Sequence, residues 1–176
     1  MRSGTMPTRA LILAQGNQGI KIYKEADGYP EEVVPLLLAV TDLFREERGF
    51  WDPERFMAQV LIGLGLKDRL SRGPGKGMAP PSPVFGYALT TGWRWVDYIY
   101  FVRDDYTLEI YQPGEGWGEG IGLDEGEAWQ KGCQRVAFAC LEDKECRKFY
   151  KAWKTLLATP LRSGEGEERQ RKTLLH

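Results

Sequence analysis

Carboxylates gather on one short stretch, between an alternating apolar segment and an amphipathic one. Asp27 is followed closely by Glu31 and Glu32. Oxygen ligands of this kind hold divalent cations, so one hypothesis is a carboxylate or metal enzyme with its site here. The alternative is structural: Asp27 caps a helix, and the glutamates interact with the positive end of the helix dipole. We favour this alternative, because every residue of the stretch has a place in a turn or a helix start.

Cysteine and histidine offer little further chemistry. Cys133, Cys140 and Cys146 are separated by six and five residues, a spacing that matches no usual zinc knuckle. The single histidine is the terminal residue, His176, so a Ser-His-Asp or Cys-His relay would depend on the chain end. We therefore predict no catalytic residue, no metal site and no cofactor. The thiols are expected to be reduced and buried on the apolar faces of their elements.

Composition indicates one globular domain. The chain has 176 residues, of which 28% are charged, and a net charge of −1, which argues against bulk attraction to nucleic acid or anionic membrane. A membrane span needs about 18 consecutive apolar residues, and no apolar run approaches that length. The N-terminus also lacks a secretory signal, so a cytoplasmic protein is expected. Asn17 is the only asparagine while Arg and Glu are abundant, a bias that also occurs in heat-adapted proteins. The predicted organisation is a flexible N-terminus or cloning remnant (1–8), an α+β domain (9–160) and a polar tail (161–176).

The carboxylate stretch is predicted to be a sharp corner between a strand and a helix. Residues 9–14 and 19–24 alternate with period two and are joined by GNQG, which predicts a β-hairpin. Gly28 is expected to take a positive φ in the turn that follows. Pro30 suits the first turn of a helix that ends near Gly49. Pro35 lies inside this helix and either delays its regular start or bends its first turns.

This corner resembles a group of small uncharacterised proteins from phages and bacterial mobile elements. A strand ends in an aromatic residue, a polar spacer follows, and DGYPE leads into a helix. The residues that carry the resemblance are Ile22, Tyr23, Lys24, Asp27, Gly28, Tyr29, Pro30 and Glu31. The resemblance implies a small α+β domain and brings no established activity or catalytic residue. Many such sequences carry an aromatic residue or a histidine in the spacer, where this chain has Glu25 and Ala26.

Further along the chain, turn residues divide apolar segments into short elements. Asp52 and Asp143 are predicted to cap a second and a last helix, and Pro160 to end the last one. Residues 71–83 form a Gly- and Pro-rich loop whose GPGKG lacks the first Gly and the Ser or Thr of a phosphate loop. Strands are predicted at 85–90, 96–103 and 107–111, a glycine-rich acidic loop at 113–122, and either a helix or a strand at 125–141. The fold class is α+β: one domain, an antiparallel sheet of about four strands, and two to four helices packed on one face.

Aromatic residues in and just before the predicted strand 96–103 suggest a binding surface. Tyr98 and Tyr100 share one strand face, which either packs under other elements or faces solvent. Trp, Tyr and Arg are favoured at protein interfaces. The candidate partner-binding residues are Trp93, Trp95, Tyr98, Tyr100, Arg72 and Lys76.

Three functions follow from these residues. We expect a non-enzymatic accessory or regulatory protein of a phage or mobile element that binds a protein partner. The alternative is a single-stranded nucleic-acid binder that uses the sheet aromatics and the basic loop from Lys67 to Lys76. The third is the carboxylate or metal enzyme. The sequence leaves the partner and the oligomeric state open.

Overall fold

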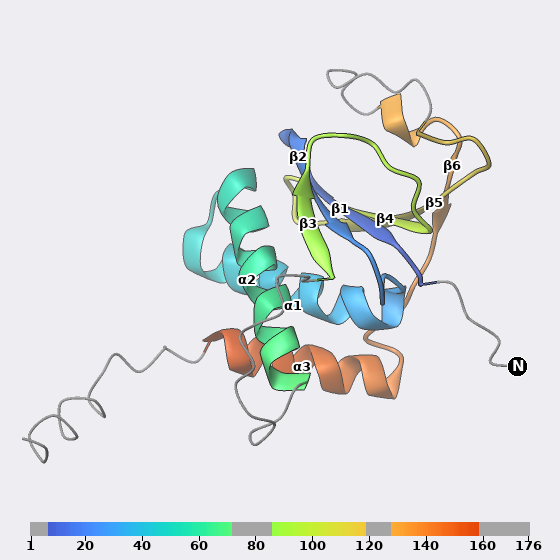
Figure 1. Ribbon diagram of the computed structural model, residues 1–176. Coiled ribbons are helices and arrows are strands. Elements are labelled where there is room, and N and C mark those ends of the chain that lie inside the picture. Colours follow the sequence, from blue (N-terminus) through green and yellow to red (C-terminus); the bar gives the residue numbers. More distant parts are fainter. Residues whose placement is uncertain (1–6, 72–85, 119–127, 159–176) are drawn as a thin grey trace, which may run out of the picture.

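A single six-stranded sheet organises the protein (Figure 1). The computed structural model describes residues 7–71, 86–118 and 128–158. The strand order across the sheet is β3-β2-β1-β4-β5-β6. The strands are β1 (Ala10–Ala14), β2 (Asn17–Lys24), β3 (Tyr87–Thr90), β4 (Tyr98–Val102), β5 (Leu108–Pro113) and β6 (Cys133–Val136).

The sheet is mixed, which corrects the expectation of about four antiparallel strands. The predicted hairpins β1–β2 and β4–β5 are both present and antiparallel. Their first strands, β1 and β4, lie side by side and run parallel, from Ala10↔Tyr98 to Ala14↔Val102. Period two shows which residues share a face, but it carries no information about which strand lies next to which. The edge strand β6 is short and largely exposed, so it leaves only a weak alternation in the sequence.

In the residue ranges that the structure describes, three α-helices lie on one face of the sheet, as predicted (Figure 1). They are α1 (Pro30–Arg48), α2 (Pro53–Ser71) and α3 (Lys144–Ala158). The predicted caps of α2 and α3 are confirmed, because the backbone N–H groups of Arg55 and Cys146 donate to the carboxylates of Asp52 and Asp143. None of these helices is both long and apolar enough to cross a membrane.

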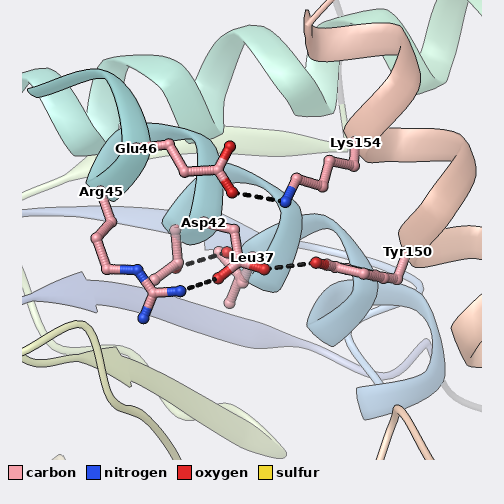
Figure 2. Close-up of polar contacts among 7 residues, drawn as sticks. Leu37, Asp42, Arg45, Glu46, Tyr150 and Lys154 are labelled. Atoms are coloured by element: carbon pink, nitrogen blue, oxygen red, sulfur yellow. Dashed lines mark hydrogen bonds and ion pairs between the residues drawn. The ribbon is translucent and has the colours of Figure 1, made fainter.

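Polar contacts join α1 to α3 (Figure 2). The hydroxyl of Tyr150 donates to Asp42, which also pairs with Arg45 on its own helix at 3.1 Å. One turn further along α1, the Glu46 carboxylate accepts a hydrogen bond from Lys154 at 2.8 Å. In Figure 1, α1 lies between the sheet and α3, so these contacts hold the outer helix in place.

The opposite face of the sheet is covered by aromatic side chains. Leu11, Leu13, Ile99 and Phe101 point from the strands into this second core. The fully buried ring of Trp129, in a 3-10 turn at Ala128–Gln130, lies 5.4 Å from Phe101 between ring centres. The connection between β3 and β4 arches over this face in Figure 1 and adds Val96 and Trp93. Both faces of the central strands are therefore buried.

The corner before α1 departs from the prediction in two ways. Tyr29 is the N-cap of α1 and makes no side-chain cap bond, so Asp27 does not cap this helix. Asp27, rather than Gly28, takes a positive φ, of 52°. Position 28 requires a glycine because the turn passes close to the backbone of the chain that enters β1. An added Cβ would lie 2.8 Å from the carbonyl carbon of Arg9 and 2.9 Å from the Ala10 nitrogen. The helix runs from Pro30 through Pro35 without a delayed start.

Candidate functional site

Tyr98 and Tyr100, the tyrosine row of β4, lie on the helix-covered face of the sheet, so this face packs under other elements. Tyr100 is 0% exposed and its hydroxyl donates to the carbonyl oxygen of Gly28 at 2.7 Å. Burial raises the pKa of Tyr100 far above the usual range of a tyrosine. Tyr98 stacks on Tyr100 with 6.3 Å between ring centres and is only half-buried. Tyr100 therefore cannot contact a partner, whereas part of Tyr98 can.

Trp93 lies on the other side of the sheet and is mainly a packing residue. Its ring meets Trp117 edge-on at 5.6 Å and stacks on Trp129 at 6.1 Å. The ammonium group of Lys21 lies 4.2 Å from the centre of the Trp93 ring and donates to the carbonyl oxygen of Thr91 at 2.8 Å. Lys21 is 0% exposed, and its burial lowers its pKa. These contacts fix the connection from residue 91 to residue 97 on the sheet.

The same connection presents its next two side chains to solvent. Trp95 is 50% exposed, and Arg94 is exposed with its guanidinium 5.2 Å from the centre of the Tyr23 ring. Val96 then returns to the core at 1% exposure. Burial varies along the connection because Trp93 and Val96 pack against the sheet on either side of Arg94 and Trp95. Arg94 and Trp95 consequently protrude from a well-supported backbone.

A groove of about 670 Å³ begins at Trp95. The last residue pair between strands β4 and β5 is Ile99↔Tyr111. Beyond this pair the two strands separate, and the groove lies there. Gly114 and Gly132 keep the ends of β5 and β6 together through an N–H to carbonyl bond of 2.8 Å. The groove is lined by Thr8, Trp95, Val96, Asp97, Tyr98, Gln112, Pro113, Gly114, Gly132, Cys133 and Gln134.

The chemistry of this groove is polar with an aromatic rim. One carboxylate oxygen of Asp97 accepts the backbone N–H of Arg9 at 2.7 Å, which fixes its orientation. Gln112 and Gln134 are register partners on β5 and β6, and both are exposed. Burial raises the pKa of Cys133 to about 11, and its thiol donates to the carbonyl oxygen of Trp129 at 3.4 Å. The groove thus offers amides, one carboxylate and an indole, with a thiol that is protonated near neutral pH.

The carboxylates at the corner do not converge on one point. Asp27 accepts a long hydrogen bond, 3.4 Å, from the hydroxyl of Tyr29, and this carboxylate is the main cause that raises the pKa of Tyr29. Glu31 and Glu32 follow in the first turn of α1. Among the described residues, no group of three or more His, Cys, Asp or Glu side chains is placed to hold a metal ion.

The structure separates the predicted partner-binding residues. Trp95 and Tyr98 meet at the groove, while Trp93 and Tyr100 are packed into the two opposite cores. Arg72 and Lys76 lie outside the described residues. Sequence reasoning missed Gln112 and Gln134, because nothing in the spacing indicates that the ends of β4, β5 and β6 meet. No protein-family model, curated protein or solved structure matches this chain.

Proposed function

We propose that the protein acts by binding a protein partner at the surface formed by Arg94, Trp95 and the strand-end groove. The observation that carries this proposal is the half-exposed Trp95 at the rim of a polar groove of about 670 Å³. A tryptophan in such a position leaves apolar area in water, and a partner that covers it removes that area.

The arrangement has the features of an interface hot spot. Trp and Arg are the residues that most often dominate binding energy, usually inside a ring of polar contacts. Here the guanidinium of Arg94 lies over the Tyr23 ring, a contact that restricts its freedom before a partner binds. The amides of Gln112 and Gln134 and the carboxylate of Asp97 supply hydrogen-bonding groups beside Trp95. Held side chains lose less conformational freedom on binding, which favours affinity.

Three further observations support a protein partner. The strand–DGYPE–helix segment resembles proteins of phages and mobile elements, which suits an accessory role. Base stacking on the sheet would need the tyrosine row, and Tyr100 is buried beneath the start of α1. The described groove lining also carries a carboxylate and no lysine or arginine, so Arg94 beside it would be the one cation available to a phosphate backbone among the residues of the proposed surface.

Affinity capture with a matched control tests the proposal. The wild type, Trp95→Ala and Phe149→Ala are immobilised, and proteins retained from a lysate of the native host are identified by mass spectrometry. Phe149, on α3, is a suitable control because it is 49% exposed, nearly the same as Trp95. A partner retained by the wild type and by Phe149→Ala is then purified and titrated. We expect Trp95→Ala to bind it about 30-fold more weakly, the loss typical of a hot-spot residue.

Two results would contradict the proposal. One is a folded Trp95→Ala variant that binds the purified partner as tightly as the wild type. The other is a salt-dependent quench of tryptophan fluorescence by single-stranded oligonucleotides that Trp95→Ala abolishes, which would assign the same surface to nucleic acid.

A further inference from the structure

Two buried cysteines lie against each other at the start of α3. Glu142 and Asp143 both donate their backbone N–H to the carbonyl oxygen of Ala139, at 3.0 and 3.3 Å, which closes a tight turn. This turn folds Cys140 back toward the first turn of α3, where Cys146 follows the Asp143 cap. Each cysteine is 2% exposed, both belong to the helix-covered core, and each thiol lies close enough to the other to affect its pKa.

We propose that Cys140 and Cys146 form a thiol-oxidation site that a low-molecular-weight disulfide converts into an internal disulfide. In the first step, the thiolate of one cysteine attacks a sulfur of the small disulfide, forms a mixed disulfide and releases one small thiol. In the second step, the neighbouring thiolate attacks the protein sulfur of that mixed disulfide and displaces the second small thiol. The protein loses two hydrogen atoms overall, and the small disulfide gains them as two thiols.

The contact between the thiols decides the product, and their burial decides the rate. A mixed disulfide at either cysteine has a second thiol beside it, so the internal bond forms without a large movement of the chain. Burial raises the pKa of both thiols, that of Cys146 to about 12, so little thiolate is present in the closed structure. The first attack therefore requires a local opening of the first turn of α3, and the reaction on the folded protein is slow.

Cys133 provides an internal comparison. It is half-buried, packs against the second core, and its thiol faces the carbonyl oxygen of Trp129. Neither of the other cysteines contributes to its pKa shift, which comes from burial. With no second thiol beside it, Cys133 stops at the mixed disulfide. The same oxidant thus gives two different products in one chain.

The internal disulfide has a consequence for the helix layer. It would tie the start of α3 to the turn that enters it, while the bonds of Tyr150 and Lys154 join the rest of α3 to α1. A closed loop of this size restricts the unfolded chain and is expected to raise Tm by about 5–10 °C in a protein of this length. The start of the outer helix would then respond to the redox state of its surroundings.

The test uses the full-length Cys133→Ser variant, which removes the lone thiol. It is incubated overnight with oxidised glutathione, denatured in the presence of an alkylating reagent, and examined by intact mass and peptide mapping. The expected result is a protein lighter by two hydrogen atoms, with no alkylated cysteine, a Cys140–Cys146 cross-linked peptide and a higher Tm. In the further variant Cys146→Ser, the glutathione adduct should remain on Cys140. Two alkylated thiols, or a stable glutathione adduct on Cys133→Ser, would overturn the proposal. The reduced wild-type protein measured alongside gives the reference Tm.

Discussion

The hydroxyl of Tyr100 donates a hydrogen bond to the carbonyl oxygen of Gly28 at 2.7 Å. This bond joins the middle of β4 to the turn that begins α1, and both residues are buried. On the other side of the turn, the backbone N–H of Gly28 donates to Thr8 at 2.9 Å. Thr8 and Tyr98 also line the strand-end groove. The DGYPE corner and the aromatic strand are thus one structural unit, with the proposed binding surface at its margin.

Tyr100→Phe should destabilise the protein by about 1–3 kcal/mol, because it leaves the buried Gly28 carbonyl without a donor. The measurement is urea unfolding followed by far-UV circular dichroism. Tyr98→Phe is the matched control, since in the part of the chain that the structure describes the Tyr98 hydroxyl makes no hydrogen bond. Equal unfolding free energies for the two variants would show that the Tyr100–Gly28 bond contributes nothing.

Gly28→Ala should lower the unfolding free energy by about 1–3 kcal/mol through overpacking. The new methyl group would meet the backbone of Arg9 and the backbone and Cβ of Ala10, the first residue of the central strand β1, and these atoms cannot move aside. Gly19→Ala is the control, because a Cβ at position 19 meets nothing within 4 Å. If the two alanine variants unfold at the same urea concentration, the fold accommodates the methyl group at position 28 without loss of unfolding free energy, and the prediction is wrong.

Sequence patterns predicted the local elements well and the long-range neighbours poorly. Pro30 and Gly49 bound α1 as their types suggest, and Asp52 and Asp143 cap their helices. These signals act over a few residues. The parallel contact of β1 with β4 joins segments nearly ninety residues apart, and no local preference encodes it.

The candidate site shows the same limit. Trp93, Trp95, Tyr98 and Tyr100 are equally aromatic in sequence, yet their exposure ranges from full burial of Tyr100 to half exposure of Trp95. The difference arises from which sheet face each residue meets and from what covers that face. The groove itself forms where two paired strands diverge, and no single segment contains that information.

The buried Glu109 should make stability depend on pH in acid. Burial opposes its charged form, but hydrogen bonds from Arg103 and Tyr111, with the charges of Arg103 and Arg135, outweigh this and lower the pKa of Glu109. A carboxyl whose folded pKa lies below its unfolded value of about 4.3 stabilises the fold above that pH. This stabilisation is lost as the pH falls through the folded pKa.

Glu109→Gln isolates this effect. At pH 7 the variant should be less stable than the wild type by about 1–3 kcal/mol. The difference should stay constant down to about pH 5 and shrink below about pH 4.3. Asp105 and Asp143 also have lowered pKa values, through hydrogen bonds from backbone N–H groups, but they are present in both proteins and cancel in the difference. A difference that grows in acid would contradict the assignment.

Tyr150→Phe should loosen α3 from α1, with a loss of about 1 kcal/mol in the unfolding free energy. The Tyr150 hydroxyl donates to a partly buried carboxylate, Asp42, which is 25% exposed. Lys154→Ala removes a neighbouring contact to Glu46, but that pair is exposed and should contribute less than the Tyr150–Asp42 bond. The comparison is made by urea unfolding at low and moderate salt. A larger effect of Lys154→Ala would mean that the exposed pair holds the two helices together.

Trp95→Ala should leave the fold intact, whereas Trp129→Ala should not. Trp129 is fully buried, with Phe101 and Tyr111 edge-on at 5.4 and 5.2 Å, so its removal leaves a cavity that costs about 3–5 kcal/mol. Trp95 is half exposed, and Trp93 and Val96 hold its backbone, so its truncation should cost less than about 1 kcal/mol.

Urea unfolding and near-UV circular dichroism measure both variants. A near-native Tm for Trp95→Ala is what makes its loss of partner binding interpretable as a loss of contact. Should Trp95→Ala instead unfold as readily as Trp129→Ala, Trp95 would be a structural residue, and the proposed binding surface would lose its central side chain.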